Sequence, residues 1–373
     1  MTSFFATCAR GFEPFLAREL EKIAASDIQP GRGGVHFQGN RRVLYKSNLH
    51  LRTAVRVLQP LRTFPVQSTD ELYQAAQTID WEKYLTLEHT FAIDCNVRDS
   101  AITHSLFAAQ RVKDAICDQF IARCGKRPSV NLREPMVQFN LHIFRNEASI
   151  SLDSSCESLH KRGYRPIQTI APLNEALAAA LILQTGWKPD EPFCDPMCGS
   201  ATLPIEASWM ALNRAPGLTR KHFGFMGWLD YDKGEWANVR DEARNDLKKA
   251  LLAPIIGYDE RVDVIELASK NANAAGVGHL VELRAQGLYK FVPSEGKPGT
   301  ILMNPPYGER IGEEEDLIEL YQQIGKIIKT RCTGWKCWIF TGNRNLLRAT
   351  KLKVLEKHQF MNGKIDCQLA RVL

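Results

Sequence analysis

The 373-residue sequence has no hydrophobic run long enough to cross a membrane and no recognisable export signal. A membrane-spanning helix needs about 18 or more consecutive apolar residues. The opening residues, Met1-Thr2-Ser3-Phe4-Phe5, lack the charged region and the long apolar stretch of a signal peptide. We therefore expect a cytoplasmic protein with no membrane partner.

Cysteine is present, but not in a metal-binding pattern. The ten cysteines are scattered without a CxxC pair, and the closest two, Cys194 and Cys198, have no neighbouring His or Cys. A zinc site needs four converging ligands. The cysteines are therefore expected to be reduced thiols, and no metal is expected.

The length and the composition are those of a globular protein with more than one domain. Hydrophobic residues make up 44% and charged residues 24% of the chain, as is typical of globular proteins. A chain of 373 residues is too long for one ordinary core, which implies two or three domains.

The net charge of +6 is modest, and half of it is concentrated in one segment. Residues 161–170 contain three cations, Lys161, Arg162 and Arg165, and no carboxylate. A flexible basic segment that also contains an aromatic residue, Tyr164, can bind a phosphate backbone. From composition alone, a solvated linker is the simpler explanation of such a run.

The tetrapeptide Asn304-Pro305-Pro306-Tyr307 indicates chemistry on an exocyclic amine of a nucleobase. The Asn304 carboxamide oxygen and the Pro305 carbonyl oxygen can accept the two N–H hydrogens of such an amine, which points its lone pair at an electrophile. The prolines stiffen the loop, and Tyr307 can stack on a base that has left its helix. Four residues are also compatible with a simple loop that caps a strand.

A strand, a glycine turn and a helix are predicted over residues 191–210. The apolar strand ends at Asp195, the turn 196–202 consists of small residues around Gly199, and the helix begins near residue 203. This order is the nucleotide-binding opening of a doubly wound α/β domain. The turn has neither a GxGxxG nor a GxxxxGK[ST] pattern, which disfavours dinucleotide redox chemistry and a phosphate loop.

A second carboxylate, Asp259, follows the next predicted strand, 254–258. A carboxylate at the tip of that strand suits the two hydroxyls of a ribose. Asp195 and Asp259 could each also be an ordinary helix-capping residue.

Alternation of apolar residues predicts the remaining elements. In the first 155 residues we expect strands at 4–8, 52–58 and 91–97, helices at 12–23 and 105–124, and hairpins that join 33–37 with 41–45 and 137–144 with 148–152. From residue 171 onward helices and strands alternate, which favours a mostly parallel sheet. Asn362-Gly363 predicts a terminal hairpin between residues 353–360 and 364–372.

In this order, the motifs resemble class I S-adenosylmethionine-dependent methyltransferases, and more specifically the THUMP-domain RNA guanine-N2 methyltransferases. The resemblance covers essentially the whole chain and rests on residues 160–165, 171–175, 195–202, 215–218, 223–225, 304–312 and 362–363. Within this family, the chain is most similar to the N2-methylguanine-forming half of the bacterial large-subunit ribosomal RNA enzymes.

The resemblance implies an α/β fold with several domains. It places a ferredoxin-like segment at 1–64, a THUMP RNA-binding domain at 65–155, a basic linker at 156–170 and a methyltransferase domain at 171–373. The last is expected to be Rossmann-like, with a mostly parallel seven-stranded sheet and a terminal antiparallel hairpin. The preceding domains are expected to be α+β.

The resemblance also implies roles for individual residues. The expected catalytic loop is Asn304, Pro305, Pro306 and Tyr307. The expected contacts to S-adenosylmethionine are Asn174, Glu175, Asp195, Pro196, Cys198, Gly199, Ser200, Thr202, Asp259 and Gln286, the last at a position where many relatives have an Asp. The expected RNA contacts are Lys161, Arg162, Tyr164, Arg165 and Arg310, although Arg310 could equally form a surface ion pair with Glu313 or Glu314.

The function expected from these features is methylation of a guanine N2 amine in RNA, with 23S ribosomal RNA as the substrate. A transfer RNA guanine and an adenine N6 amine are alternatives with the same chemistry. A non-catalytic RNA-binding or assembly factor is an alternative of another class, which the intact loop and glycine turn disfavour. The sequence does not identify the modified nucleotide, the recognition of the cofactor adenine or the oligomeric state.

Overall fold

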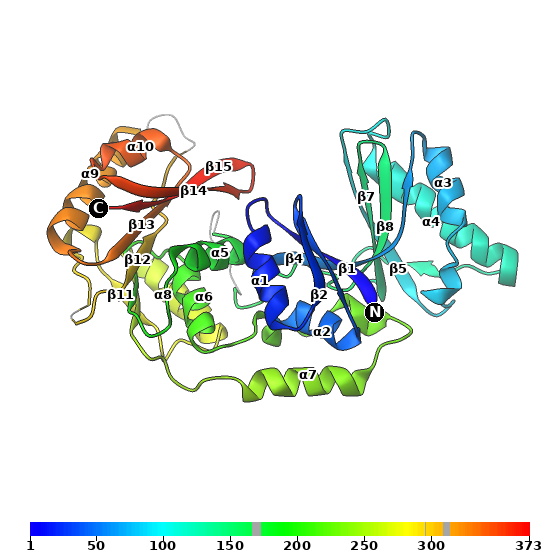
Figure 1. Cartoon of the computed structure of the whole chain (residues 1–373), viewed down its shortest axis with the longest axis horizontal. Coiled ribbons are helices and arrows are strands. Elements are labelled where there is room, and N and C mark those ends of the chain that lie inside the picture. The colour runs from blue at the N-terminus through cyan, green and yellow to red at the C-terminus, as the bar shows by residue number, and fades with distance from the viewer. Residues whose placement is uncertain (166–172, 295, 309–313) are drawn as a thin grey trace. The chain divides into compact units, whose positions relative to one another are not determined.

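The computed structural model describes residues 1–165, 173–294, 296–308 and 314–373 (Figure 1). They form two compact units, each assembled from stretches that are far apart in the sequence. The first unit consists of Met1–Cys8, Leu16–Leu159 and Arg220–Arg240, and the second of Ala9–Phe15, His160–Thr219 and Asp241–Leu373. Within these described ranges, no helix is long and apolar enough to span a membrane.

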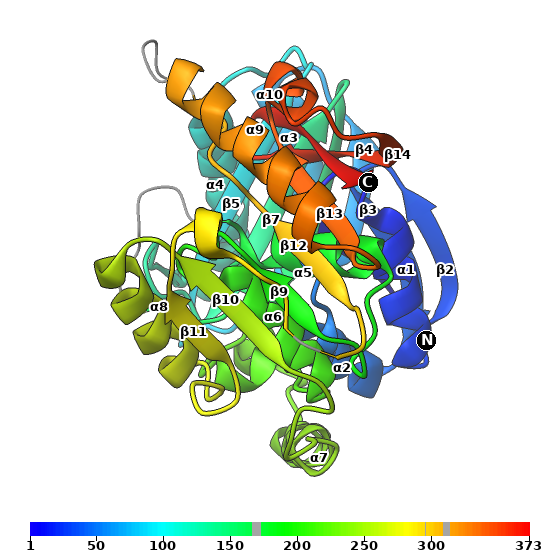
Figure 2. The same ribbon diagram turned by 90° about the vertical axis from the view of Figure 1, so that its left-hand side faces the viewer.

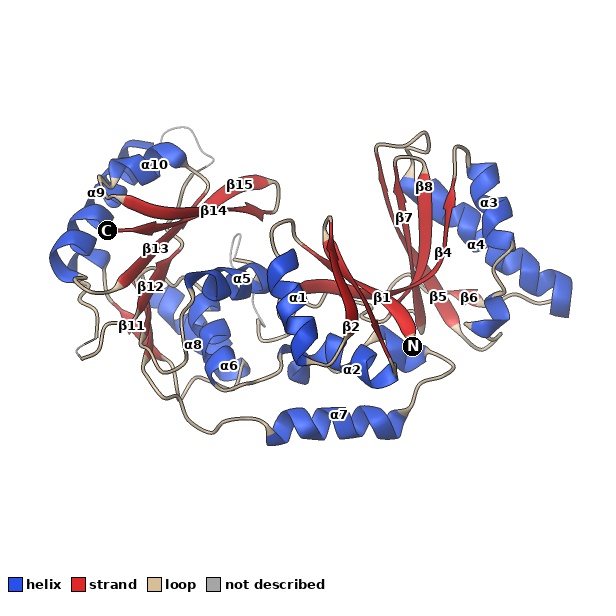
Figure 3. Cartoon of the chain, in the orientation of Figure 1, coloured by secondary structure: helices blue, strands red, loops and turns tan. Residues whose placement is uncertain are grey.

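The first unit is built on an eight-stranded sheet in the order β2-β3-β1-β4-β8-β7-β5-β6 (Figure 3). The long strand β4 pairs antiparallel with β1 along its first part and with β8 along its second part, so it joins the two halves of the sheet. The strands are β1 (Thr2–Cys8), β2 (Ser26–Gly31), β3 (Gly34–Gly39), β4 (Ala54–Pro65), β5 (Thr90–Arg98), β6 (Ser129–Val130), β7 (Val137–Phe144) and β8 (Glu147–Asp153).

The helices among the first 125 residues are α1 (Glu13–Lys22), α2 (Arg41–His50), α3 (Thr69–Gln77) and α4 (Ser105–Cys124), with a 3₁₀ turn, η1 (Trp81–Lys83). The predicted helix at 105–124 is confirmed. The predicted strand at 41–45 is wrong, because these residues form the first turns of α2. The Asn40 side chain accepts a hydrogen bond from the Val43 amide at 3.0 Å, which caps this helix.

Residues 220–240 lie in the sequence beyond the first helices of the second unit but pack in the first unit. Phe225 and Trp236 surround the buried ring of Tyr45, with centroid distances of 4.5 and 5.8 Å. A Cβ atom added to Gly224 would lie 2.2 Å from the carbonyl oxygen of Asp153, so only glycine allows this close approach. The segment is therefore part of the core of the first unit.

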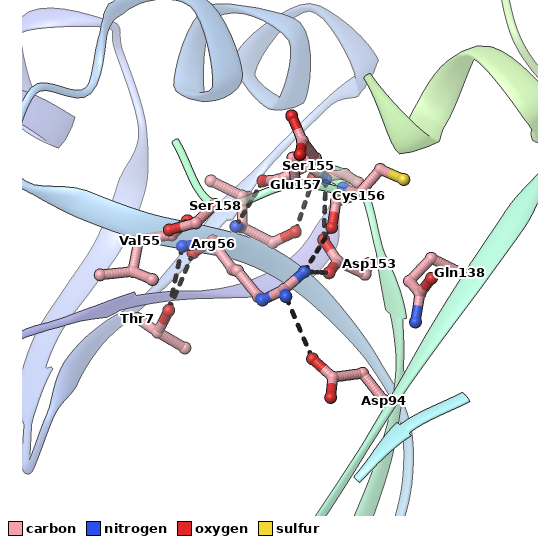
Figure 4. Close-up of polar contacts among 12 residues, drawn as sticks. Thr7, Val55, Arg56, Asp94, Gln138, Asp153, Ser155, Cys156, Glu157 and Ser158 are labelled. Carbon is pink, nitrogen blue, oxygen red and sulfur yellow. Dashed lines mark hydrogen bonds and ion pairs between the residues drawn. The ribbon is translucent and has the colours of Figure 1, made fainter. Parts of the chain in front are cut away.

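A buried ion pair connects several strands of the first unit (Figure 4). The Arg56 guanidinium, from β4, pairs with the fully buried carboxylate of Asp153 at the end of β8. It also contacts the Cys156 carbonyl oxygen at 2.6 Å and Asp94, in β5, at 3.0 Å. Burial raises the pKa of Asp153, and Arg56 opposes this shift.

The second unit contains a seven-stranded sheet in the order β11-β10-β9-β12-β13-β15-β14 (Figure 2). All neighbouring strands are parallel except those that pair with β15. The hairpin between β14 and β15 turns at Gly363, which has a φ of +63°. The predicted mostly parallel sheet with a terminal antiparallel hairpin is therefore confirmed. The strands are β9 (Phe193–Asp195), β10 (Ile255–Asp259), β11 (Glu282–Ala285), β12 (Thr300–Met303), β13 (Lys336–Thr341), β14 (Val354–Asn362) and β15 (Ile365–Val372).

The helices that follow residue 173 are α5 (Glu175–Thr185), α6 (Thr202–Ala211), α7 (Lys233–Asn245), α8 (Val262–Ala274), α9 (Glu314–Arg331) and α10 (Arg344–Ala349), with 3₁₀ turns η2 (Pro216–Thr219), η3 (Gly224–Gly227) and η4 (Leu288–Lys290). The strand order reverses at β9, which pairs with β10 on one side and β12 on the other. Ligands of such sheets bind beyond the carboxyl ends of the strands at this point.

We expect Arg56→Ala to lower the free energy of unfolding by about 3 kcal/mol, because it leaves the buried Asp153 carboxylate without its cation. Adding Asp153→Asn should restore part of this loss. The measurement is urea denaturation followed by circular dichroism. The control is Arg98→Ala, which removes an exposed ion pair with Asp99 and should cost about 1 kcal/mol or less. Equal losses in the two single variants would contradict the role given to Arg56.

Candidate active site

A cavity of about 810 Å³ opens beyond the carboxyl ends of β9, β10 and β12. The structure brings nine of the predicted site residues together in its wall: Asp195, Pro196, Cys198, Gly199, Ser200, Thr202, Asp259, Asn304 and Pro306. Its other lining residues include Leu288, Tyr289, Glu260, Asp263, Leu320 and Gln323, none of which was predicted.

The glycine turn forms one wall of the cavity and leaves open space in front of its backbone. Gly199 has a φ of +51°, and a Cβ atom added to it would have no neighbour within 4 Å. The turn is bound to the neighbouring strand β10, because the Cys198 amide donates a hydrogen bond to the Tyr258 carbonyl oxygen at 2.7 Å. A ligand can therefore approach the backbone at Gly199 closely.

The Asp259 carboxylate links the tips of β9 and β10. One oxygen accepts a hydrogen bond from the Gly199 amide at 3.2 Å, and the other accepts from the Arg261 amide at 3.1 Å. A carboxylate has about four acceptor positions, so Asp259 can still accept hydrogen bonds from hydroxyl groups in the cavity.

Asp195, at the end of β9, is the buried carboxyl group of the site and is only 2% exposed. It accepts a hydrogen bond from the Met197 amide at 3.1 Å. Burial raises the pKa of Asp195 to about 8; the nearby Asp259 also raises it, and the Met197 hydrogen bond lowers it. A cation bound next to Asp195 would stabilise its charged form.

The structure does not bring Gln286 into this cavity. Its backbone amide donates a hydrogen bond to the Asp259 carbonyl oxygen at 2.8 Å, but the residue is not among those that line the cavity. Leu288 and Tyr289, in η4, line it instead. The signal in the sequence for this part of the wall is Tyr289, an aromatic residue shortly after the third strand, whereas the prediction of Gln286 rested on its place where many relatives have an acidic residue.

Asn174 and Glu175 also lie outside the wall of the cavity. The Asn174 side chain caps α5 by accepting hydrogen bonds from the Ala176 and Leu177 amides at 2.9 and 3.2 Å. Glu175 is 6% exposed, and its carboxylate lies 3.4 Å from the Arg165 guanidinium. Asn174 therefore caps a helix and Glu175 pairs with Arg165, and neither residue lines the cavity.

Two of the residues predicted to contact RNA in the basic linker are buried. Arg162 and Tyr164 are each 1% exposed. Arg162 pairs with Glu206, in α6, at 3.5 Å, and the Tyr164 hydroxyl lies 3.3 Å from the same carboxylate. These positions contradict the predicted contact of Arg162 and Tyr164 with RNA. Of the four described residues of this segment that were predicted to contact RNA, Lys161 is the exposed cation.

Arg165 holds the glycine turn from outside the cavity. Its guanidinium donates to the hydroxyl oxygen of Thr202, at the start of α6, and to the Leu173 carbonyl oxygen at 2.7 Å. The Thr202 hydroxyl lies 3.3 Å from that of Ser200. Arg165 therefore ties this segment to the turn and is not available to a phosphate group. The remaining predicted RNA contact, Arg310, lies outside the described residues.

The loop Asn304–Tyr307 lies between two cavities. Asn304 and Pro306 line the large one, whereas Tyr307 lines a second cavity of about 370 Å³, together with Gly308, Gly342, Asn343, Arg344, Asn345 and Ile365. Pro305 is buried. The Asn304 side-chain oxygen is also buried, and it has no hydrogen-bond donor among the residues that the structure describes. An acceptor in this state is costly unless a ligand supplies a donor.

Exposed arginines and aromatic rings gather in the first unit, at the turns of two hairpins. The Phe144 ring, at the end of β7, lies 5.1 Å from the Arg145 guanidinium and 5.9 Å from that of Arg32, in the turn between β2 and β3. The His142 ring stacks with Phe144 at 6.4 Å. Arginine and aromatic side chains together are typical of surfaces that bind single-stranded nucleic acid.

Comparison with known proteins identifies three segments of the chain. The methyltransferase-domain pattern described as RMKL-like matches residues 162–371. A THUMP domain matches residues 66–153, and an RlmL ferredoxin-like domain matches residues 3–58.

Whole-chain comparisons agree with these segments. The ribosomal RNA large subunit methyltransferase K/L of Syntrophotalea carbinolica is 42% identical over 98% of this chain and 53% of its own length. This chain thus spans about half the length of the curated relatives that it matches. The crystal structure of SMU.472 complexed with SAH is 31% identical, has a TM-score of 0.91 and covers 99% of this chain and 97% of its own. A Listeria monocytogenes structure, named a predicted N6-adenine-specific DNA methylase, is 32% identical with a TM-score of 0.89, and covers 100% of this chain and 96% of its own.

The stability of the second unit should depend on pH through Asp195. The pKa of this residue is about 8 in the fold, against about 3.9 in an unfolded chain. Between these values the folded state binds a proton that the unfolded state does not, so the contribution of Asp195 to stability is full below about pH 4 and is lost as the pH rises through about 8.

We therefore expect Asp195→Asn to become more stable relative to the wild type as the pH rises from 5 to 8. Urea unfolding at pH 5, 6.5 and 8 measures this difference. Asp190→Asn, an exposed site on the loop before β9, is the control and should show no such trend. A difference between Asp195→Asn and the wild type that stays constant with pH would contradict the expected titration.

Proposed function

The chain belongs to the family of RMKL-like methyltransferases, and on this premise we propose that it methylates the exocyclic N2 amine of a guanine in RNA, with S-adenosylmethionine as the methyl donor. The proposed substrate is 23S ribosomal RNA, because the curated relatives are named ribosomal RNA large subunit methyltransferases. Those relatives are about twice as long as this chain, so the proposal concerns the reaction of this chain alone.

The observation that supports this reaction most directly is the state of the Asn304 side-chain oxygen. It is buried, lacks a donor among the described residues and belongs to a residue in the wall of the large cavity. An exocyclic amine offers the N–H hydrogens that would satisfy it. The Pro305 carbonyl oxygen can accept the second hydrogen, since no proline contributes a competing N–H in that loop.

The large cavity fits the proposed methyl donor. The open space at Gly199 admits the methionine part, where the Asp195 carboxylate can bind its amino group, and Asp259 can accept hydrogen bonds from the ribose hydroxyls. Leu288 and Tyr289 offer a surface for the adenine ring. S-adenosylmethionine supplies a methyl group that its positive sulfur already activates.

The protein residues then act mainly by orientation. Accepting both N–H hydrogens localises the lone pair of the amine and directs it at the methyl carbon. Because the amine gains a positive charge during transfer, its proton can leave afterwards without a strong base. The Asn304 oxygen also stabilises this developing charge, and such electrostatic help is commonly the largest single contribution of a protein group.

Two features favour RNA over DNA. The Asn304–Tyr307 loop by itself does not distinguish guanine N2 from adenine N6. The matches to a THUMP domain and to an RlmL ferredoxin-like domain cover most of the first 153 residues, and the arginines around Phe144 lie in these segments. We propose that this surface contacts RNA in place of Arg162 and Tyr164, which are buried.

We expect Asn304→Ala to lower the single-turnover rate by about 100-fold or more while leaving S-adenosylmethionine affinity near that of the wild type. Asp259→Ala should have the opposite effect, a loss of cofactor binding of about 1.5–3 kcal/mol, because a charge-assisted acceptor is removed. Calorimetry and quenched single-turnover assays separate the two. A wild-type rate for Asn304→Ala on saturating RNA would refute the proposed activation of the amine.

Nucleoside mass spectrometry identifies the substrate. Ribosomal and transfer RNA from a deletion strain are compared after complementation with the wild-type chain or with Asn304→Ala. N2-methylguanosine that returns in 23S ribosomal RNA only with the wild-type chain supports the proposal. Its return only in transfer RNA, or the return of N6-methyladenosine, would replace it with one of the alternatives.

The surface around Phe144 gives a further prediction about RNA binding. The double variant Arg32→Ala/Arg145→Ala should bind RNA more weakly and with a shallower dependence on salt concentration, because fewer counterions are released. The control, Arg18→Ala/Arg133→Ala, removes two other exposed arginines of this unit. Fluorescence anisotropy between 50 and 300 mM salt measures both. Equal salt slopes for the two double variants would exclude a specific role for this surface.

A further inference from the structure

The turn of the C-terminal hairpin is connected to the Asn304–Tyr307 loop by a side-chain hydrogen bond. Asn362, the last residue of β14, donates from its amide nitrogen to the Tyr307 hydroxyl oxygen at 2.8 Å. The Cys367 thiol, in β15, lies 3.8 Å from the same oxygen. The hydroxyl of Tyr307 is therefore engaged by the hairpin, 55 residues further along the chain.

A second contact restrains the Tyr307 ring from the end of β13. A Cβ atom added to Gly342 would lie 3.0 Å from two ring carbons of Tyr307 and 3.0 Å from a methyl carbon of Ile365. The ring thus packs directly against the backbone of Gly342. It also packs against the core that includes Tyr321 and Ile339. Three parts of the fold, the ends of β13 and β14 and the start of β15, restrain one ring.

The restrained ring forms a wall of the cavity of about 370 Å³ that Gly342, Asn343, Arg344 and Ile365 also line. A nucleobase that leaves its helix needs a flat surface that is already in place, because an unrestrained partner would lose conformational entropy on binding. The hydroxyl is used by Asn362, so the ring face and edge, and not the hydroxyl, are what Tyr307 offers to a base.

We propose that Asn362 is a positioning residue for methyl transfer, which fixes the Tyr307 ring as the wall against which the extruded base is held. Asn362 acts only through the Tyr307 hydroxyl and touches neither the base nor the cofactor. This inference rests on the proposed function. It adds a role in methyl transfer to the C-terminal hairpin, which would otherwise be only a tight turn.

A double-mutant cycle tests the inference. Asn362→Ala and Tyr307→Phe should each lower the single-turnover rate by about three- to tenfold, the effect of one lost hydrogen bond. The double variant should be no slower than either single variant, because both remove the same interaction. The affinity for S-adenosylmethionine should remain that of the wild type in all three. The proposal would be overturned if the rate losses of the two single variants multiplied in the double variant. In that case Asn362→Ala would have the same effect in the Tyr307→Phe background as in the wild type.

Two further variants distinguish positioning from a general effect on folding. Asn362→Asp keeps a residue that favours the same tight turn and can accept a hydrogen bond from the Tyr307 hydroxyl, so it should restore most of the rate, but only when Tyr307 is present. Gly342→Ala should displace the ring from the other side and lower the rate without changing cofactor affinity. Lys364→Ala, in the exposed part of the same turn, is the control and should be active.

The outcomes also separate this inference from the proposed function. An active wild-type chain whose Asn362 and Tyr307 variants behave independently overturns the role of Asn362 and leaves the methyltransferase assignment intact. A wild-type chain that binds S-adenosylmethionine but modifies no guanine in RNA overturns the proposed function, and the positioning role falls with it.

Discussion

The pairing of β9 with β10 on one side and with β12 on the other is the constraint on which the site depends. Parallel pairing brings the carboxyl ends of the three strands to one edge of the sheet, so Asp195, Asp259 and Asn304 meet although they are spread over more than one hundred residues. The hydrogen bond from the Gly199 amide to Asp259 then joins two of the strand ends directly. The cavity exists because the chain leaves the sheet in opposite directions at this point.

Local patterns predicted the part of the site that lies on these strand ends. A short apolar run followed by a carboxylate identified Asp195 and Asp259, and the proline-stiffened loop identified Asn304. Partners from distant parts of the chain could not be predicted in this way. Arg162 and Tyr164 look like a solvated linker because Glu206, which binds both, lies in a helix about forty residues away. Arg41–Tyr45 shows the same limit at short range, since the cap at Asn40 outweighs the strand-like pattern.

Among the residues that the structure describes, buried carboxyl groups are of two kinds. Asp153 and Glu206 are matched by the arginines Arg56 and Arg162 and hold segments of the fold together. Asp195 is partnered by a backbone amide and faces a cavity. The first kind contributes to the stability of the fold. In the second kind, burial disfavours the charged carboxylate, and a positively charged group of a ligand would favour it. This arrangement is common at functional sites.

Because residues 220–240 pack in the first unit, they also constrain when that unit can fold during synthesis. When the ribosome has synthesised residues 1–159, the sheet of the first unit is complete in sequence, but Tyr45 still lacks Phe225 and Trp236. This aromatic core can close only after some eighty further residues, including β9 and α6 of the other unit, have emerged. The first unit therefore cannot finish folding before part of the second unit has been synthesised, and a fragment that ends at Leu159 would carry an exposed apolar surface.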